Sequence, residues 1–179
     1  RQGNILTRLI FINVAVFVLL GLLFVLLRLF TSDVTLSDLQ AQFNDTVLKY
    51  LMVPSVPGEL LRRPWTIITY MFTHFNFLHI LFNMLVLFWF GKIFLQYLSA
   101  RQMVSTYILG GLAGAILSII FINGFPGLRE HLGSPMLGAS ASIMAIVIAI
   151  AFYVPDYTLY LLFIGPVRLK YIALVFIIM

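Results

Sequence analysis

The sequence has very little charge and no cysteine. Only 9% of its 179 residues are charged and 62% are apolar, whereas a soluble domain has about 25% charged and about 45–50% apolar residues. So few polar side chains cannot cover a water-facing surface, which excludes a large soluble domain. The absence of cysteine excludes disulfides, thiolate metal sites and a thiol nucleophile. We therefore interpret residues 1–179 as a single integral membrane domain with room for about four to six spans.

Acidic residues are also scarce, and the chain carries a net charge of +5. The basic residues are scattered singly or in pairs, so the sequence does not predict nucleic-acid binding. They precede the first apolar run, separate the second from the third, and interrupt the last: Arg1, Arg8, Lys92, Arg101, Arg168 and Lys170. By the positive-inside rule, these places and the amino end are cytoplasmic.

The apolar runs predict an all-α, polytopic helix bundle. Four complete spans are predicted, over residues 5–30, 77–98, 102–122 and 137–152. The fourth is short for a full crossing and needs shielding by its neighbours. The last stretch is interrupted by Gly165-Pro166, and only nine residues follow Lys170. Because a span takes about 20 residues, we expect an incomplete fifth span, and hence a domain that is incomplete at its C-terminal end.

Residues 31–64 form a polar connection that we expect on the extracytoplasmic side. Apolar residues recur in it at helical spacing: Leu36, Leu39, Phe43, Val47 and Leu51. This pattern predicts an amphipathic helix, preceded by a capping box from Thr35 and Asp38. The helix either lies on the membrane surface or packs on its own protein.

Strongly polar side chains open the second predicted span. His74, Asn76, His79 and Asn83 fall within the run HFNFLHILFN. Such groups cost a few kcal/mol each in a bilayer and usually face the protein interior or a water-filled cavity. His79 and Asn83 are four residues apart and share one helix face. They act either as hydrogen-bonding glue between helices or in a functional site, with His74 and Asn76 at its polar entrance. Nearby aromatic residues are typical of an interfacial belt: Trp65, Tyr70, Phe72 and Phe77.

Small residues open the fourth predicted span, in the run LGASASIMA. Close helix packing alone explains such a run. Alternatively, Ser140 is a nucleophile at a helix N-terminus, where backbone N–H groups and the helix dipole stabilise an oxyanion. A glycine pair, Gly110 and Gly114, forms a GxxxG pattern in the third span. We interpret this pair as packing within the chain rather than dimerisation.

In combination, His74, His79 and Asn83, followed by Gly138-Ala139-Ser140-Ala141, resemble the rhomboid family of intramembrane serine proteases, and its bacterial branch most of all. Gly91, which closes the run FWFG, and the glycines of the third span match as well. The resemblance extends from the first span to the end of the chain.

This resemblance implies a six-helix core that cleaves transmembrane protein substrates within the lipid bilayer. It assigns Ser140 as the nucleophile, His79 and Asn83 as oxyanion donors, and His74 and Gly138 as supporting residues. It implies neither a cofactor nor a metal, leaves the oligomeric state undefined, and predicts an integral multi-pass protein of the bacterial cytoplasmic membrane.

The family's base histidine lies on a sixth span that nothing in this chain matches. The three histidines are His74, His79 and His131, and His131 falls in a turn-rich loop. We therefore expect the base downstream of Met179 and no activity from this stretch alone. Many members carry a Trp-Arg pair in the first connection, whereas here Trp65 is followed by Thr66 and Arg62 and Arg63 come earlier. The sequence therefore leaves open which residue anchors this connection. The alternative function is a non-catalytic rhomboid-like protein that binds transmembrane helices.

Overall fold

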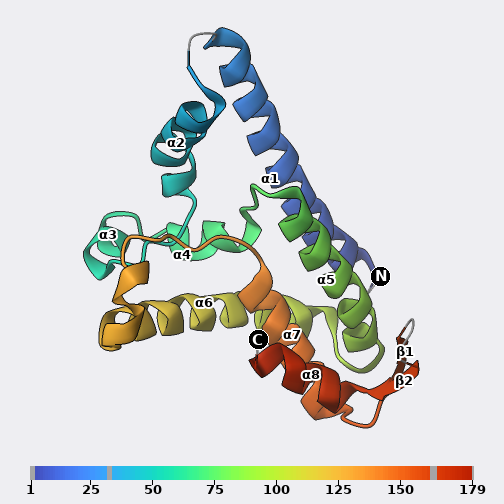
Figure 1. The fold of residues 1–179 in the computed structure, drawn as a ribbon. Coiled ribbons are helices and arrows are strands. Elements are labelled where there is room, and N and C mark those ends of the chain that lie inside the picture. The colour runs from blue at the N-terminus through green and yellow to red at the C-terminus, as the bar shows by residue number, and fades with distance from the viewer. Residues whose placement is uncertain (1–2, 32–33, 162–164, 179) are drawn as a thin grey trace.

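The computed structural model describes residues 3–31, 34–161 and 165–178 (Figure 1). Within these ranges, three helices are long and apolar enough to cross a membrane: α1 (Gly3–Phe30), α5 (Phe77–Tyr97) and α6 (Ala100–Gly124). The other elements are α2 (Leu36–Thr46), η1 (Leu48–Tyr50), α3 (Pro57–Arg62), α4 (Thr66–Thr69), η2 (Tyr70–Phe72), η3 (Pro126–His131), α7 (Ser140–Tyr153), β1 (Thr158–Leu161), β2 (Gly165–Arg168) and α8 (Leu169–Ile178). The fold class is therefore the predicted all-α membrane bundle, with one small hairpin among the described residues.

Half of the described basic residues belong to one end of the fold: Arg8, Lys92, Arg101, Arg168 and Lys170. Figure 1 shows the beginning of α1, the end of α5 and the β1–β2 hairpin together at the lower right, away from α2 and α3. Lys92, Arg101 and Arg168 belong to α5, α6 and β2. This arrangement agrees with the common side that the charge pattern predicts for them.

The helix that carries Ser140 is short and enclosed. The prediction that it begins at residue 137 was wrong: Gly138 has φ +109°, which an α-helix does not accept, and α7 begins at Ser140. Its 14 residues contact α5, α6 and α8. Ile146, Val147 and Ile150 are fully buried, which supplies the shielding that so short an apolar helix needs.

The last stretch does not begin as a helix. β1 and β2 pair antiparallel, with Thr158 opposite Arg168, and α8 follows from Leu169. Asp156 accepts hydrogen bonds from Lys170 and Arg168, at 2.9 and 3.1 Å. These two cations hold the pKa of its carboxyl below the usual range. The ion pairs lie at the open end of the hairpin, beside Thr158 and Arg168, whereas Gly165-Pro166 begins β2 at the turn end.

The amphipathic helix of the first connection packs on its own protein. Leu39 and Phe43 are buried in α2, and the Phe43 ring lies 5.3 Å from Phe24 of α1 and 5.2 Å from Phe75. One half of the predicted capping box is present, because the Thr35 side chain accepts from the Asp38 backbone N–H. The Asp38 carboxylate accepts from the Thr35 hydroxyl at 2.7 Å instead of from the Thr35 backbone N–H. The protein therefore covers the apolar face from Leu39 onward, whereas Leu36 at the start of the helix is exposed.

The glycine pair of α6 packs against α7. A Cβ at Gly110 would lie 2.2 Å from the Ala145 Cβ, and one at Gly114 would lie 2.4 Å from the Ala141 Cβ. Both distances are far below van der Waals contact, so only glycine permits this approach. The preferred interpretation, packing within the chain, is confirmed.

Candidate functional site

A tight turn leads into α7 and brings its start against α5. Gly138 donates its N–H to the Tyr70 carbonyl at 2.9 Å. A Cβ at Gly138 would lie 2.6 Å from Cε1 and 2.8 Å from Nε2 of His79. The positive φ and this close contact both require glycine. The imidazole of His79 therefore lies directly beside the turn that precedes Ser140.

Ser140 is the first residue of α7 and is exposed. Its hydroxyl makes no hydrogen bond within the described part of the chain. α7 has no side-chain N-cap, and the first amide paired within the helix is that of Ile143, which donates to the Ala139 carbonyl. The amides of its first turn are thus free of intrahelical partners, as is usual at a helix start. They present N–H donors and the positive end of the helix dipole beside the hydroxyl.

Local sequence fixes the start of α5 in the same way. Asn76 caps the helix, because its Oδ1 accepts from the His79 backbone N–H at 3.1 Å. His79 is half-buried, and one turn on Asn83 donates from Nδ2 to Nε2 of His74 at 3.0 Å. The two residues that share a predicted helix face therefore both reach the region around Gly138 and His74.

His74 joins α5 to the turn before α7. Its Nε2 accepts from the Ala139 backbone N–H at 3.2 Å as well as from Asn83. A nitrogen that accepts two N–H groups carries no proton, so the imidazole is neutral with its proton on Nδ1. Burial, assisted by the nearby His79, lowers the pKa of His74 to about 4. This low pKa agrees with a neutral imidazole. His74 is fully buried, so its predicted place at a polar entrance was wrong.

The five predicted site residues therefore meet. Ser140 and Gly138 come from the start of α7, His79 and Asn83 from α5, and His74 from the segment ahead of α5. The remaining histidine, His131, lies exposed in η3, 3.5 Å from Glu130. Chemically, the cluster offers a hydroxyl beside N–H donors. No described base contacts the hydroxyl.

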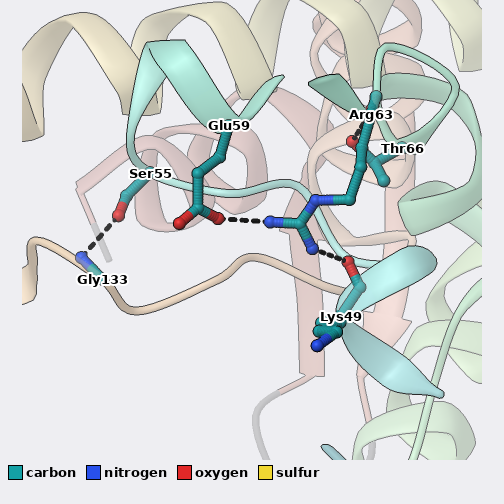
Figure 2. Close-up of polar contacts among 6 residues, drawn as sticks. All are labelled: Lys49, Ser55, Glu59, Arg63, Thr66 and Gly133. Carbon is teal, nitrogen blue, oxygen red and sulfur yellow. Dashed lines mark hydrogen bonds and ion pairs between the residues drawn. The ribbon is translucent and has the colours of Figure 1, made fainter. Parts of the chain in front are cut away.

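The segment ahead of Ser140 is also fastened to the first connection. Val53 and Met136 exchange two backbone hydrogen bonds, at 2.8 and 3.0 Å. The Ser55 Oγ accepts from the Gly133 N–H at 2.7 Å (Figure 2), and the Ser55 carbonyl accepts from Asn123 at 2.8 Å. Ser55 is buried. The first connection thus holds the backbone that leads to the site.

An arginine anchors the first connection internally. Figure 2 shows the Arg63 guanidinium between the Glu59 carboxylate and the Lys49 carbonyl, donating to both. Trp65 adds a hydrogen bond from Nε1 to the Tyr50 carbonyl at 2.9 Å. The sequence left this anchor open. The structure assigns it to Arg63, two residues before the tryptophan, instead of to the residue after it.

A cleft of about 1080 Å³, with both polar and apolar lining, opens between the first connection and the segment 133–137. Asn76 and His79 line it where it reaches the site. Other lining residues come from α2, η1, α3 and the loop before α7: Asn44, Asp45, Lys49, Glu59, Arg62, Gly133 and Pro135. The cleft connects the half-buried His79 to the exterior. Asn76, which the sequence analysis placed at the entrance to the site, lines this cleft.

A second polar cluster was missed by the sequence analysis. Asn13 in α1 is fully buried and donates to the Leu9 carbonyl at 2.8 Å and to the Tyr107 hydroxyl at 3.2 Å. Tyr107 in turn donates to the Met71 carbonyl at 2.8 Å. Tyr70, predicted in an interfacial aromatic belt, is instead buried in the protein and donates to the Gly111 carbonyl. The sequence signal that could have revealed this cluster was Asn13, a single asparagine within an apolar run.

Comparison with known proteins identifies the class of protein. Residues 61–179 match the family described as Rhomboid domain. This match covers more than half of the chain, which therefore belongs to the rhomboid family. No solved structure matches it significantly.

Two curated relatives carry related names. Presenilin-associated rhomboid-like protein A, mitochondrial, from Danio rerio is 32% identical over 85 residues, which cover 48% of this chain and 21% of the relative. RHOMBOID-like protein 12, mitochondrial, from Arabidopsis thaliana is 28% identical over 134 residues, covering 70% of this chain and 40% of the relative. The chain thus spans less than half of either relative. Both names describe mitochondrial proteins. They give no support to the bacterial branch of the family that the sequence led us to expect.

Proposed function

We propose that the full-length protein is an intramembrane serine endopeptidase in which Ser140 is the nucleophile. The observation that carries the proposal is the exposed Ser140 hydroxyl at an uncapped helix start, with His79 packed against Gly138 two residues before it. Membership of the rhomboid family agrees with this chemistry. The substrates we propose are transmembrane proteins with a segment that unwinds beside the start of α7.

The reaction is acyl transfer. The Ser140 Oγ attacks the peptide carbonyl carbon while a base takes its proton, and the carbonyl oxygen becomes an oxyanion. The proton passes to the leaving amine as the C–N bond breaks. Water then hydrolyses the resulting ester and restores the hydroxyl. The cleft that ends at Asn76 and His79 supplies a path for this water.

Three donors are proposed for the oxyanion: the His79 ring, the Asn83 amide and the Ser140 backbone N–H. Asn83 uses one N–H for His74, which leaves its second for the oxyanion. His74 has a supporting role, because it orients both Asn83 and the Ala139 amide. Such preorganised donors are effective because they need no rearrangement as charge develops.

The base is proposed to lie outside residues 1–179, on the sixth span that the family resemblance implies. A serine hydroxyl is a weak nucleophile until a base lies within hydrogen-bond reach. We therefore expect residues 1–179 alone to be inactive. We place the site on the side of the membrane opposite the basic ends of the helices, where the amphipathic connection 31–64 also lies.

A serine-directed fluorophosphonate probe tests the proposal on the full-length protein in membranes. We expect labelling that Ser140→Ala abolishes. Ser142→Ala is the matched control, because Ser142 lies two residues on but is buried. Labelling that survives Ser140→Ala would exclude Ser140 as the nucleophile. A correctly folded protein that takes no label would instead favour the non-catalytic protein that binds transmembrane helices.

A further inference from the structure

A second cavity lies between the beginning of α1 and the last part of α5. Its volume is about 700 Å³, within the usual range for a ligand pocket. Its apolar walls are formed by Leu6 and Ile10 from α1 and by Phe88 and Leu95 from α5. The polar lining consists of Thr7, Lys92 and Gln96. At Gly91, the residue before Lys92, a Cβ would lie 2.6 Å from the Leu6 side chain. The two helices therefore meet closely beside the cavity.

The charge in this cavity is of one sign. Lys92 is exposed, and its Nζ lies 4.0 Å from the centre of the Phe88 ring. No carboxylate pairs with Lys92 among the described residues, and no acidic side chain lines the cavity. The cavity therefore combines an apolar interior with a cation that has no counter-ion from the protein.

We propose that this cavity binds an anionic phospholipid, with an acyl chain against the apolar walls and the headgroup phosphate at Lys92. Three observations favour this occupant. The cavity lies between two membrane helices, its interior is apolar, and its cation, Lys92, belongs to the last part of α5, the end of the helix that Figure 1 shows near the β1–β2 hairpin. Basic pockets between membrane helices on the positively charged side commonly bind anionic headgroups. The proposal is independent of Ser140.

The simpler explanation of Lys92 is that its side chain only extends to the membrane interface. A lysine near a helix end often does so without selecting a lipid. That alternative predicts equal affinity for anionic and zwitterionic lipids. The proposed site predicts a preference for anionic lipids that depends on Lys92.

The test uses the detergent-purified, delipidated full-length protein, titrated with phosphatidylglycerol and followed by native mass spectrometry. Phosphatidylcholine provides the zwitterionic comparison, and glycerol phosphate provides the headgroup without chains. We expect phosphatidylglycerol to bind more tightly than phosphatidylcholine. Lys92→Gln should weaken phosphatidylglycerol binding about fivefold and leave phosphatidylcholine unchanged.

Two further variants complete the test. Lys49→Gln, which removes an exposed lysine from the first connection, should leave lipid binding unchanged. Ile10→Trp should weaken both lipids by filling the cavity. If Ile10→Trp does not fold, the lipid affinities of Lys92→Gln alone test the proposal. Equal effects of the two lysine variants, an unchanged affinity in Lys92→Gln, or equal binding of glycerol phosphate would each overturn the proposal.

Discussion

The segment that leads into Ser140 and the body of the helix that follows it are held by different forces. Residues 133–139 are held by hydrogen bonds that they donate to Ser55, Tyr70 and His74 and exchange with Val53. The body of α7 is held by contact of small and aliphatic side chains with α6 and α5. Four separate partners thus fix a stretch of seven residues in which no regular helix forms.

This difference separates two properties of the protein. Hydrogen bonds are directional, so the polar contacts fix the orientation of the Ser140 backbone and of its donors. Packing of small residues fixes how closely the helices approach but orients no particular donor. We therefore expect polar substitutions near Ser140 to change the rate of cleavage most, and substitutions in the α6–α7 contact to change stability most.

The largest expected effect short of removing the nucleophile comes from Asn83→Ala in the full-length protein. Loss of an oxyanion donor costs about 2.7–4 kcal/mol of barrier, or roughly 10²–10³ in kcat. The measurement is cleavage of a transmembrane reporter in vesicles. Asn4→Ala, near the beginning of α1, is the control and should leave kcat unchanged. Wild-type kcat in Asn83→Ala would exclude the proposed role.

Acid should destabilise the protein through His74. In the unfolded chain a histidine has a pKa near 6.5, whereas His74 has a pKa of about 4 when folded. The unfolded state therefore binds more protons between these values, and stability falls as the pH falls from about 6.5 to about 4, by about 3 kcal/mol in total.

The check is the thermal midpoint as a function of pH. His74→Gln retains an acceptor for Ala139 and Asn83 but does not titrate, so it should flatten this dependence. His131→Gln, at an exposed histidine, should not. An unchanged pH dependence in His74→Gln would assign the acid sensitivity to other groups.

Gly114→Ala tests the packing of the body of α7 against α6. The new Cβ would lie 2.4 Å from the Ala141 Cβ, and overpacking of this kind costs about 1–3 kcal/mol. We expect a lower thermal midpoint. Gly21→Ala in α1 is the matched control, because a Cβ there meets nothing within 4 Å. Equal stability of the two variants would show that the α6–α7 contact is looser than described.

Ser55→Ala should have the smallest effect. It removes the acceptor for the Gly133 N–H, and an ordinary hydrogen bond contributes about 0.5–1.5 kcal/mol. We expect a small fall in kcat, with recovery in Ser55→Thr. Ser134→Ala changes an exposed neighbour and should leave kcat unchanged. A fall in thermal stability with no change in kcat would limit Ser55 to a structural role.

Much of the fold was predictable because apolar runs and helical spacing are local signals. The runs around α1, α5 and α6 predicted their positions to within a few residues, and the spacing from Leu36 to Leu51 predicted α2. The β1–β2 hairpin was not predicted, since its residues continue an apolar pattern. Its formation depends on Gly165-Pro166 and on ion pairs of Asp156 with residues that follow the turn.

The residues of the candidate site were predicted from their spacing and from the family resemblance, but their contacts were not. Nothing local in the sequence indicates that Ser55 accepts from Gly133, or that Asn13 reaches Tyr107. These pairs are 78 and 94 residues apart. The burial of Tyr70 likewise depends on its distant acceptor, Gly111. Partners so far apart are defined only by the packing of the helices.

The central claim is that Ser140 is the nucleophile of an intramembrane protease. It is tested most directly by cleavage of a transmembrane reporter with the full-length protein in vesicles, comparing wild type, Ser140→Ala and Ser142→Ala. We predict cleavage by wild type and Ser142→Ala, and none by a Ser140→Ala variant whose thermal midpoint matches that of wild type. Cleavage by Ser140→Ala at the wild-type rate would contradict the claim.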